Sequence, residues 1–210
     1  MDVKKAKAPA LGPPDLSAAE LAEFARRLAG ARNYLEFGAG GSSVLAAQAG
    51  LTAFVSVDSD PAWVDAVRAH PAVGARIAAG AGEVLHADIG PVGRWGRPAD
   101  ASQAHKWPDY AAVAFAAWRR RGAFPDLVLV DGRFRVACCL AVLHAAAASG
   151  VPAPLVLLHD FNEERSGYRA ALEFYTLENQ IDALAVLRAR ADVGTAALAE
   201  RLTAAWREVR

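Results

Sequence analysis

The chain has 210 residues, a formal net charge of +0 and a sequence pI of about 7.0. This balance excludes the strong basic charge that is typical of proteins that bind nucleic acid or anionic membranes, so neither partner is expected. Hydrophobic residues make up 54% of the chain, which favours a compact globular protein and excludes a disordered one.

The cysteines and the N-terminal segment predict the compartment. Cys138 and Cys139 are adjacent and have no other cysteine to pair with, which fits a reducing compartment. Residues 1–14 are basic and contain proline and glycine, and they lack the apolar run of a signal peptide. We therefore expect a cytoplasmic protein, with residues 1–14 as a flexible tail and residues 15–210 as a single domain.

The first predicted element is a helix over residues 16–30, in which Ser17 and Glu20 have the spacing of a capping box. Strands and helices then alternate. Short apolar runs predict strands at residues 33–37, 53–57, 83–87, 126–130, 154–158, 177–181 and 183–190. Further helices are predicted at residues 42–50, 61–70, 109–121, 134–150, 167–175 and 196–209. The expected fold is α/β, a doubly wound, mostly parallel seven-stranded sheet with helices on both faces.

Glycine or an ionisable residue follows each of the first five predicted strands. These residues are Gly38, Asp58, Asp88, Asp131 and the pair His159–Asp160. Parallel sheets of this kind bind ligands beyond the carboxyl ends of their strands, so this series predicts a binding site. For any single aspartate, a helix cap or a turn is the alternative.

The turn after the first strand reads Gly38-x-Gly40-x-x-Ser43, which departs from the dinucleotide pattern at its last position. Glu36 lies in the strand itself, two residues before the first glycine. A carboxylate there would repel a pyrophosphate but would suit a ligand that carries an ammonium group. Both features disfavour a nicotinamide-dependent oxidoreductase, which we keep as the weakest alternative.

Residues 34–42, "YLEFGAGGS", resemble the first motif of the class I S-adenosylmethionine-dependent methyltransferases. The resemblance extends over most of the chain and implies S-adenosylmethionine as the cofactor. The cofactor-binding residues that it implies are Glu36, Gly38, Gly40 and Ser42 in the first motif, Asp58 at the ribose, and Asp88 with Ile89 at the adenine.

The stretch after the fourth strand, "VDGRFR", is nearer to small-molecule O-methyltransferases than to the enzymes that modify exocyclic amines. The resemblance thus implies methyl transfer to a small molecule or sugar, on oxygen. Asp131 and His159 are the candidate catalytic bases, with a structural role as the alternative for His159. Arg133 and Arg135 are candidates for binding a substrate carboxylate or phosphate, and the alternative is that one of them pairs with Asp131.

Residues 89–108 form a long predicted loop, which is typical of a lid. Its residues Trp95 and Trp107 are candidates for lining the substrate pocket; the alternative is a hydrophobic latch that holds the loop down.

No metal requirement is expected. The alternative is a divalent ion on Asp131, Asp160 and Asn162, which resembles the catechol-type branch except that Phe161 separates the last two. A second alternative is a non-catalytic protein of the same fold that binds the cofactor or a nucleoside. The sequence predicts no particular oligomeric state.

Overall fold

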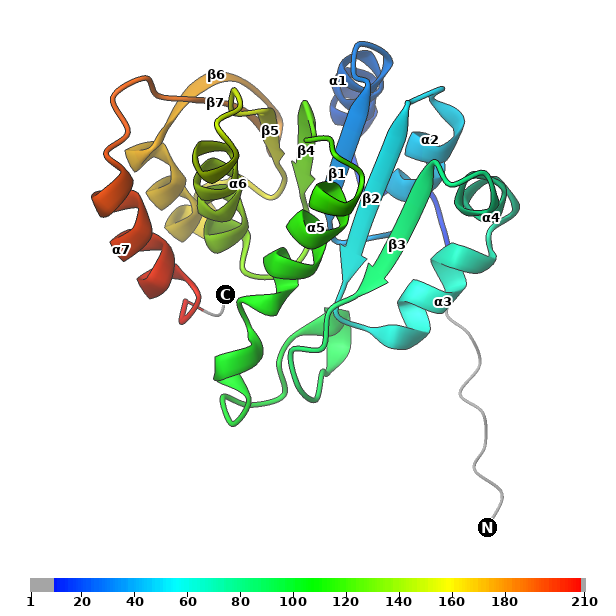
Figure 1. The fold of residues 1–210 in the computed structure, drawn as a ribbon, viewed down its shortest axis with the longest axis horizontal. Coiled ribbons are helices and arrows are strands. Elements are labelled where there is room, and N and C mark those ends of the chain that lie inside the picture. The colour runs from blue at the N-terminus through cyan, green and yellow to red at the C-terminus, as the bar shows by residue number, and fades with distance from the viewer. Residues whose placement is uncertain (1–9, 209–210) are drawn as a thin grey trace.

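A computed structural model describes residues 10–208 and contains one seven-stranded sheet in the order β3-β2-β1-β4-β5-β7-β6 (Figure 1). The strands are β1 (Asn33–Phe37), β2 (Ala53–Asp58), β3 (Gly82–His86), β4 (Leu127–Val130), β5 (Leu155–Leu158), β6 (Tyr175–Ile181) and β7 (Leu184–Ala189). Strands β1 to β5 pair in parallel, and β7 runs antiparallel to both β5 and β6. The predicted fold class is confirmed.

Helices cover both faces of this sheet. They are α1 (Ala18–Ala29), α2 (Gly41–Gln48), α3 (Pro61–Ala69), α4 (Pro71–Ala78), α5 (Asp109–Arg120), α6 (Arg135–Ser149) and α7 (Thr195–Ala205), with 3₁₀ helices η1 (Arg94–Gly96), η2 (Ala104–Lys106) and η3 (Glu163–Glu173). Helices α1 to α4 pack on one face around Tyr34 and Phe54. Helices α5 to α7 pack on the other face around Leu35 and Val55, so alternate strand residues serve the two cores.

Helix α1 begins as predicted. The Ser17 hydroxyl accepts a hydrogen bond from the Glu20 backbone N–H at 3.2 Å, and the Glu20 carboxylate accepts one from the Ser17 N–H at 2.8 Å. The same carboxylate accepts a 2.7 Å hydrogen bond from the Ala183 N–H, between β6 and β7. The capping box therefore also fastens α1 to the antiparallel edge of the sheet.

Two elements differ from the prediction. The predicted helix at residues 61–70 is followed at once by α4, because His70 adopts extended backbone before Pro71 and proline then begins a new helix. The predicted helix at residues 167–175 is instead the 3₁₀ helix η3, after which β6 begins at Tyr175.

Part of the segment predicted to be a tail lies against the domain. Residues 1–9 are outside the described residues, but residues 12–14 pack so closely on Gly41 that a Cβ there would overlap with the backbone of Pro14. The flexibility expected for this segment concerns motion and stays a prediction. No helix among residues 10–208 is both long and apolar enough to cross a membrane.

Candidate functional site

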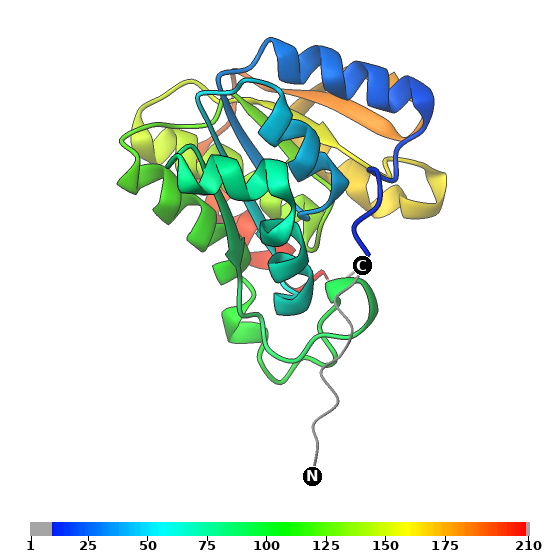
Figure 2. The ribbon, with the colours of Figure 1, turned by 90° about the vertical axis from the view of Figure 1, so that its right-hand side faces the viewer.

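A cavity of about 570 Å³ lies at the carboxyl ends of β1, β2 and β4. Loop 89–108 extends beyond these strand ends, as both views of the ribbon show (Figures 1 and 2). The lining comprises residues 12–15, residues 38–42, residues 58–60, Trp63, Trp95, Gly96, Tyr110 and residues 131–133. This is the position at which a doubly wound sheet reverses its strand order, because β2 and β4 flank β1 on opposite sides.

The turn after β1 is shaped by its contact with the turn after β4. Gly38 has a φ of +101°, and a Cβ at this position would lie 2.6 Å from the backbone nitrogen of Gly132. Only glycine allows both the left-handed backbone and the close approach. Gly38 therefore brings the two turns together, while Gly40 and Ser42 line the cavity as expected.

Glu36 lies behind the turn and not in the cavity lining. Its carboxylate is fully buried and accepts hydrogen bonds from the hydroxyls of Tyr34 at 3.0 Å, Ser56 at 2.6 Å and Ser43. The Ser43 oxygen in turn accepts a hydrogen bond from the Gly40 N–H at 3.1 Å. Burial raises the pKa of Glu36 even though the hydroxyls favour its charged form. In this structure Glu36 holds the glycine turn, and its expected contribution to the cofactor's ammonium, directly or through water, stays a prediction.

Asp58 lies at the end of β2 and lines the cavity. Its carboxylate accepts a 2.9 Å hydrogen bond from the Asp60 N–H and forms no ion pair within residues 10–208. Burial raises its pKa to about 6, and the backbone hydrogen bonds from Asp60 and Ser59 oppose this shift. Asp58 is thus a carboxylate that faces the cavity with acceptor capacity to spare.

The expected adenine contacts are not in the cavity. Asp88 is exposed, and its carboxylate binds Lys106 Nζ at 2.7 Å and the Gly90 N–H at 3.0 Å. The hydrogen bond from Lys106 is the main reason that its pKa is lowered. Ile89 is buried in the core. The cavity wall nearest to this segment is made by Ser59, Asp60 and Trp63, and the adenine contact of Asp88 and Ile89 stays a prediction.

The two tryptophans of loop 89–108 have different surroundings. Trp95 lines the cavity, is 69% exposed and has a left-handed backbone with a φ of 64°. Trp107 is buried, with its ring centroid 5.3 Å from that of Phe134. Trp95 therefore remains a pocket candidate, whereas Trp107 is the latch that the sequence analysis gave as the alternative.

A charged cluster joins the ends of β4 and β5. Asp131 Oδ1 accepts a hydrogen bond from His159 Nδ1 at 2.9 Å and forms an ion pair with Arg135 Nη2 at 3.0 Å. The second ring nitrogen of His159 lies 3.6 Å from a carboxylate oxygen of Glu20. Asp131 lines the cavity but His159 does not. His159 therefore supports Asp131 here, which is the structural alternative, and its role as a base stays a prediction.

The electrostatic surroundings of His159 fit this supporting role. Burial alone lowers its pKa, but the hydrogen bond and charge of Asp131, together with the charge of Asp160, outweigh burial and raise the net pKa. A raised pKa favours the charged imidazolium, which is the form that binds carboxylates on both sides.

Arg135 occupies the space between the carboxylates of the alternative metal site. Its Nη2 lies 3.0 Å from Asp131 and 2.9 Å from Asp160, and its Nη1 donates to the His159 carbonyl at 2.6 Å. Ligand atoms of Asp131, His159 and Asp160 lie within 4.8 Å of one another, but the guanidinium already supplies the positive charge. Asn162 caps η3 by accepting a 3.0 Å hydrogen bond from the Arg165 N–H. These residues do not fit a divalent ion while Arg135 is in place.

Arg133 has no such partners. It lines the cavity, and its Nη1 is buried without a hydrogen-bond partner among residues 10–208. Burial lowers its pKa, and the charge of Arg135 lowers it further. The two arginines that the sequence analysis treated together therefore separate: Arg135 pairs with Asp131, and Arg133 faces the cavity.

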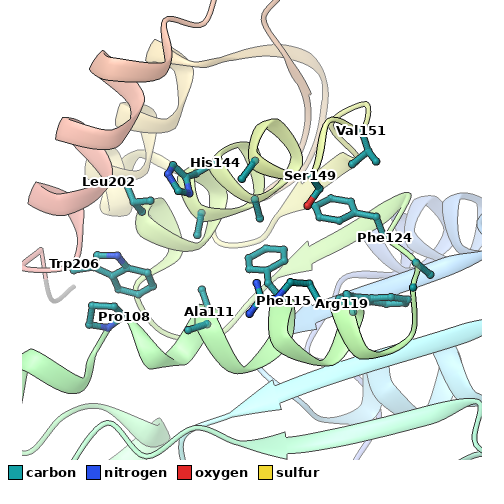
Figure 3. Close-up of a pocket in the computed structure, with 17 residues that line it drawn as sticks. Pro108, Ala111, Phe115, Arg119, Phe124, His144, Ser149, Val151, Leu202 and Trp206 are labelled. Atoms are coloured by element: carbon teal, nitrogen blue, oxygen red, sulfur yellow. The ribbon is translucent and has the colours of Figure 1, made fainter.

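A larger cavity of about 780 Å³ lies elsewhere, among α5, α6 and the end of α7 (Figure 3). Phe115, Phe124 and Trp206 project into it, with Arg119 and His144 nearby (Figure 3). The described residues that line it include no carboxylate and no residue from a strand end. The smaller cavity, which gathers the ionisable strand-end residues, is therefore the candidate functional site.

Several residues of this site were missed by sequence reasoning. They are residues 12–15, Ser59, Asp60, Trp63 and Gly132. The aspartate after the two prolines at positions 13 and 14 is the one available signal for the N-terminal part, since a rigid segment that ends in a carboxylate suits a binding wall.

Comparison with known proteins places this fold and site in a family. No family model and no curated protein matches the chain. A solved methyltransferase-like protein from Silicibacter pomeroyi is 30% identical, with a TM-score of 0.70 over 92% of this chain and 96% of that one. An O-methyltransferase from Bacillus cereus in complex with SAH is 15% identical, with a TM-score of 0.52 over 86% and 84% of the two chains. A cofactor-bound protein from MTB is 16% identical, with the same TM-score and the same coverage. The chain belongs to the class I S-adenosylmethionine-dependent methyltransferase family.

Proposed function

We propose that this protein binds S-adenosylmethionine and transfers its methyl group to an oxygen of a small molecule or sugar. The observation that carries the proposal is one cavity that joins the glycine turn after β1, Asp58 after β2 and Asp131 after β4. The turn offers backbone for close approach, and the two carboxylates offer acceptors on either side of it.

The charges around the cavity suit this cofactor. Within the described part of the chain, four aspartates line it, Asp15, Asp58, Asp60 and Asp131, together with a single arginine. S-adenosylmethionine carries an ammonium and a sulfonium, both of which carboxylates stabilise. It also carries a ribose, from whose hydroxyls Asp58 can accept hydrogen bonds. A pyrophosphate would meet repulsion from the same four carboxylates, which disfavours a nicotinamide cofactor.

When bound, the cofactor supplies an electrophilic methyl group, and the chain's own residues have to orient the acceptor and remove its proton. Asp131 is the residue placed to do both. Its Oδ1 is held by Arg135 and His159, which fixes the carboxylate and leaves Oδ2 for a ligand. Trp95 and Tyr110 add aromatic surface beside it, which suits an acceptor with an apolar part.

One observation favours a second candidate, a non-catalytic protein that binds the same cofactor. Asp131 Oδ1 already lies 3.0 Å from Arg135 Nη2 and 2.9 Å from His159 Nδ1, an arrangement that a purely structural ion-pair cluster would also have. Under this alternative, ligand binding is retained but no acceptor is methylated.

Calorimetry tests cofactor binding first. We expect S-adenosylhomocysteine and S-adenosylmethionine to bind and NAD to give no heat; tight NAD binding, or no heat from either sulfur nucleoside, would contradict the proposal. Release of S-adenosylhomocysteine with a set of hydroxylated small molecules then separates the two candidates. Asp131→Asn should keep cofactor affinity and lose at least about tenfold in turnover if Asp131 orients or deprotonates the acceptor.

A further inference from the structure

Among residues 10–208, Arg133 is the one cation in the lining of the cavity. Its Nη1 is buried and has no acceptor among residues 10–208, and the side chain forms no ion pair there. The Arg133 side chain as a whole is half-buried, and a guanidinium that is partly taken out of water without a counter-charge is held less favourably than a paired one. An unpaired arginine that lines a binding cavity therefore calls for an acceptor from outside the chain.

The neighbouring carboxylates are not that acceptor. Asp131 is engaged by His159 at 2.9 Å and by Arg135 at 3.0 Å. Asp58 attracts Arg133 electrostatically but accepts its hydrogen bonds from backbone N–H groups. The backbone also restrains Arg133, because its N–H donates to the Tyr110 hydroxyl at 3.4 Å and its carbonyl accepts from the Cys138 thiol at 3.3 Å.

From this arrangement we infer that Arg133 is a receptor for an oxyanion, a carboxylate or phosphate on the ligand that fills the cavity. A guanidinium presents paired N–H donors whose spacing matches the two oxygens of such a group. Arg135, two residues along the chain, shows the same chemistry satisfied internally, since one of its nitrogens lies within 3.0 Å of two aspartates.

The oxyanion has two sources, and both rest on the proposed function. S-adenosylmethionine carries one carboxylate of its own, and this cavity contains one arginine among four aspartates. The methyl acceptor is the other source, in which case Arg133 selects acidic acceptors over neutral ones. The recognition chemistry is the same, so the experiment has to separate the two.

The test measures affinities of four probes by calorimetry. S-adenosylhomocysteine and its decarboxylated analogue are titrated alone, and benzoate and phenyl phosphate are titrated with and without saturating S-adenosylhomocysteine. The proteins are the wild type, Arg133→Gln, Arg133→Lys and the control Arg119→Gln, whose arginine lines the other cavity. Thermal melts establish that each variant is folded. If Arg133→Gln fails to fold, Arg133→Lys replaces it, because lysine keeps the positive charge but lacks the paired N–H donors of the guanidinium.

The outcomes are distinct. If the cofactor is the source, Arg133→Gln weakens S-adenosylhomocysteine at least about tenfold and leaves the decarboxylated analogue unchanged. If the acceptor is the source, both nucleosides bind as in the wild type and the variant loses benzoate or phenyl phosphate. Unchanged affinity for all four probes, or equal losses in Arg119→Gln, overturns the inference. Failure of wild-type protein to bind either nucleoside rejects the proposed function, and Arg133 is then judged on the two anions alone.

Discussion

The ends of β2 and β5 carry the same residue type at the same edge of the sheet but use it differently. Asp58 faces the cavity, is bonded only by backbone N–H groups and has a pKa raised to about 6 by burial. Asp160 is bound by Arg135 at 2.9 Å and lies 3.4 Å from Arg165. A strand-end position therefore does not by itself make an aspartate a ligand residue. What decides is whether the chain supplies a counter-charge.

The largest expected effect comes from removing Arg135, the counter-charge for the aspartates at the ends of β4 and β5. Arg135→Met should lower the free energy of unfolding by about 3–5 kcal/mol, because Asp131 and Asp160 then lose a buried partner. Urea denaturation measures this loss. The matched control is Arg165→Met, which removes a more exposed contact with Asp160 and should cost less than about 1 kcal/mol. Equal losses in the two variants would show that Arg135 does not hold the cluster together.

The role of Asp58, the strand-end aspartate without a counter-charge, is tested through ligand affinity. Asp58→Ala should weaken S-adenosylhomocysteine binding by about 1.5–3 kcal/mol, the scale of hydrogen bonds to a charged group, with little loss of fold stability. Asp160→Ala is the comparison, because Asp160 is paired with Arg135. We expect this substitution to reduce fold stability more than the affinity for S-adenosylhomocysteine. Calorimetry and urea melts on both variants would contradict this contrast if the two losses were reversed.

Removing the Arg135 guanidinium should also make the cluster at the ends of β4 and β5 available to a metal ion. In Arg135→Gln the ligand atoms of Asp131, His159 and Asp160 would keep their positions within 4.8 Å of one another without the guanidinium between them. We expect Mn²⁺ at tenfold its dissociation constant to stabilise this variant by about 1.4 kcal/mol in a thermal melt. The wild type should show no such shift, and its cofactor binding and activity should survive EDTA. A requirement of the wild type for magnesium or manganese would contradict this account.

The sequence predicted the layout of the site better than its internal bonds. It brought Asp58, Gly38 and Asp131 to one edge of the sheet, because strand alternation and the rules of parallel sheets determine where strand ends meet. Its errors lie on the next step, where the partner of each charged group decides its role.

Glu36 and the N-terminal segment show why that step failed. The hydroxyls around Glu36 come from three different elements, β1, α2 and β2, and no local pattern links Ser56 to it across 20 residues. Likewise, the contact of Pro14 with Gly41 joins segments whose local sequence signals are independent. Periodicity identifies elements, whereas these contacts depend on how the elements pack.

A smaller effect is expected from the pH dependence of ligand affinity, through the ionisation of Asp58. Asp58 can accept hydrogen bonds from both ribose hydroxyls only when its carboxyl is ionised. Its pKa of about 6 means that the ionised form dominates above pH 6 and is lost as the pH falls below 6. S-adenosylhomocysteine affinity should thus be flat above about pH 7 and fall by up to about tenfold per pH unit below pH 6. Asp58→Asn should bind more weakly and without this slope; a slope that persists in the variant assigns the titration to another group.

The smallest expected effect concerns loop 89–108, and the two tryptophans divide it into a fixed and a movable part. Trp107 is anchored in the core against Phe134, so the end of the loop near α5 is held. Trp95 is 69% exposed and is flanked by Gly93 and Gly96, which allow this part to close over the cavity. Closure would exclude water from the bound cofactor.

Limited trypsin cleavage and fluorescence test this division. Because Arg94 is exposed directly before Trp95, saturating S-adenosylhomocysteine should slow trypsin cleavage after Arg94 by about two- to fivefold without affecting sites elsewhere. The chain has five tryptophans, so the ligand-induced change in emission has to disappear in Trp95→Phe and persist in Trp63→Phe for closure to be assigned to Trp95. Cleavage and emission that both ignore the ligand would mean that the loop is a static wall, and the exposure of Trp95 would then serve the acceptor and not a lid.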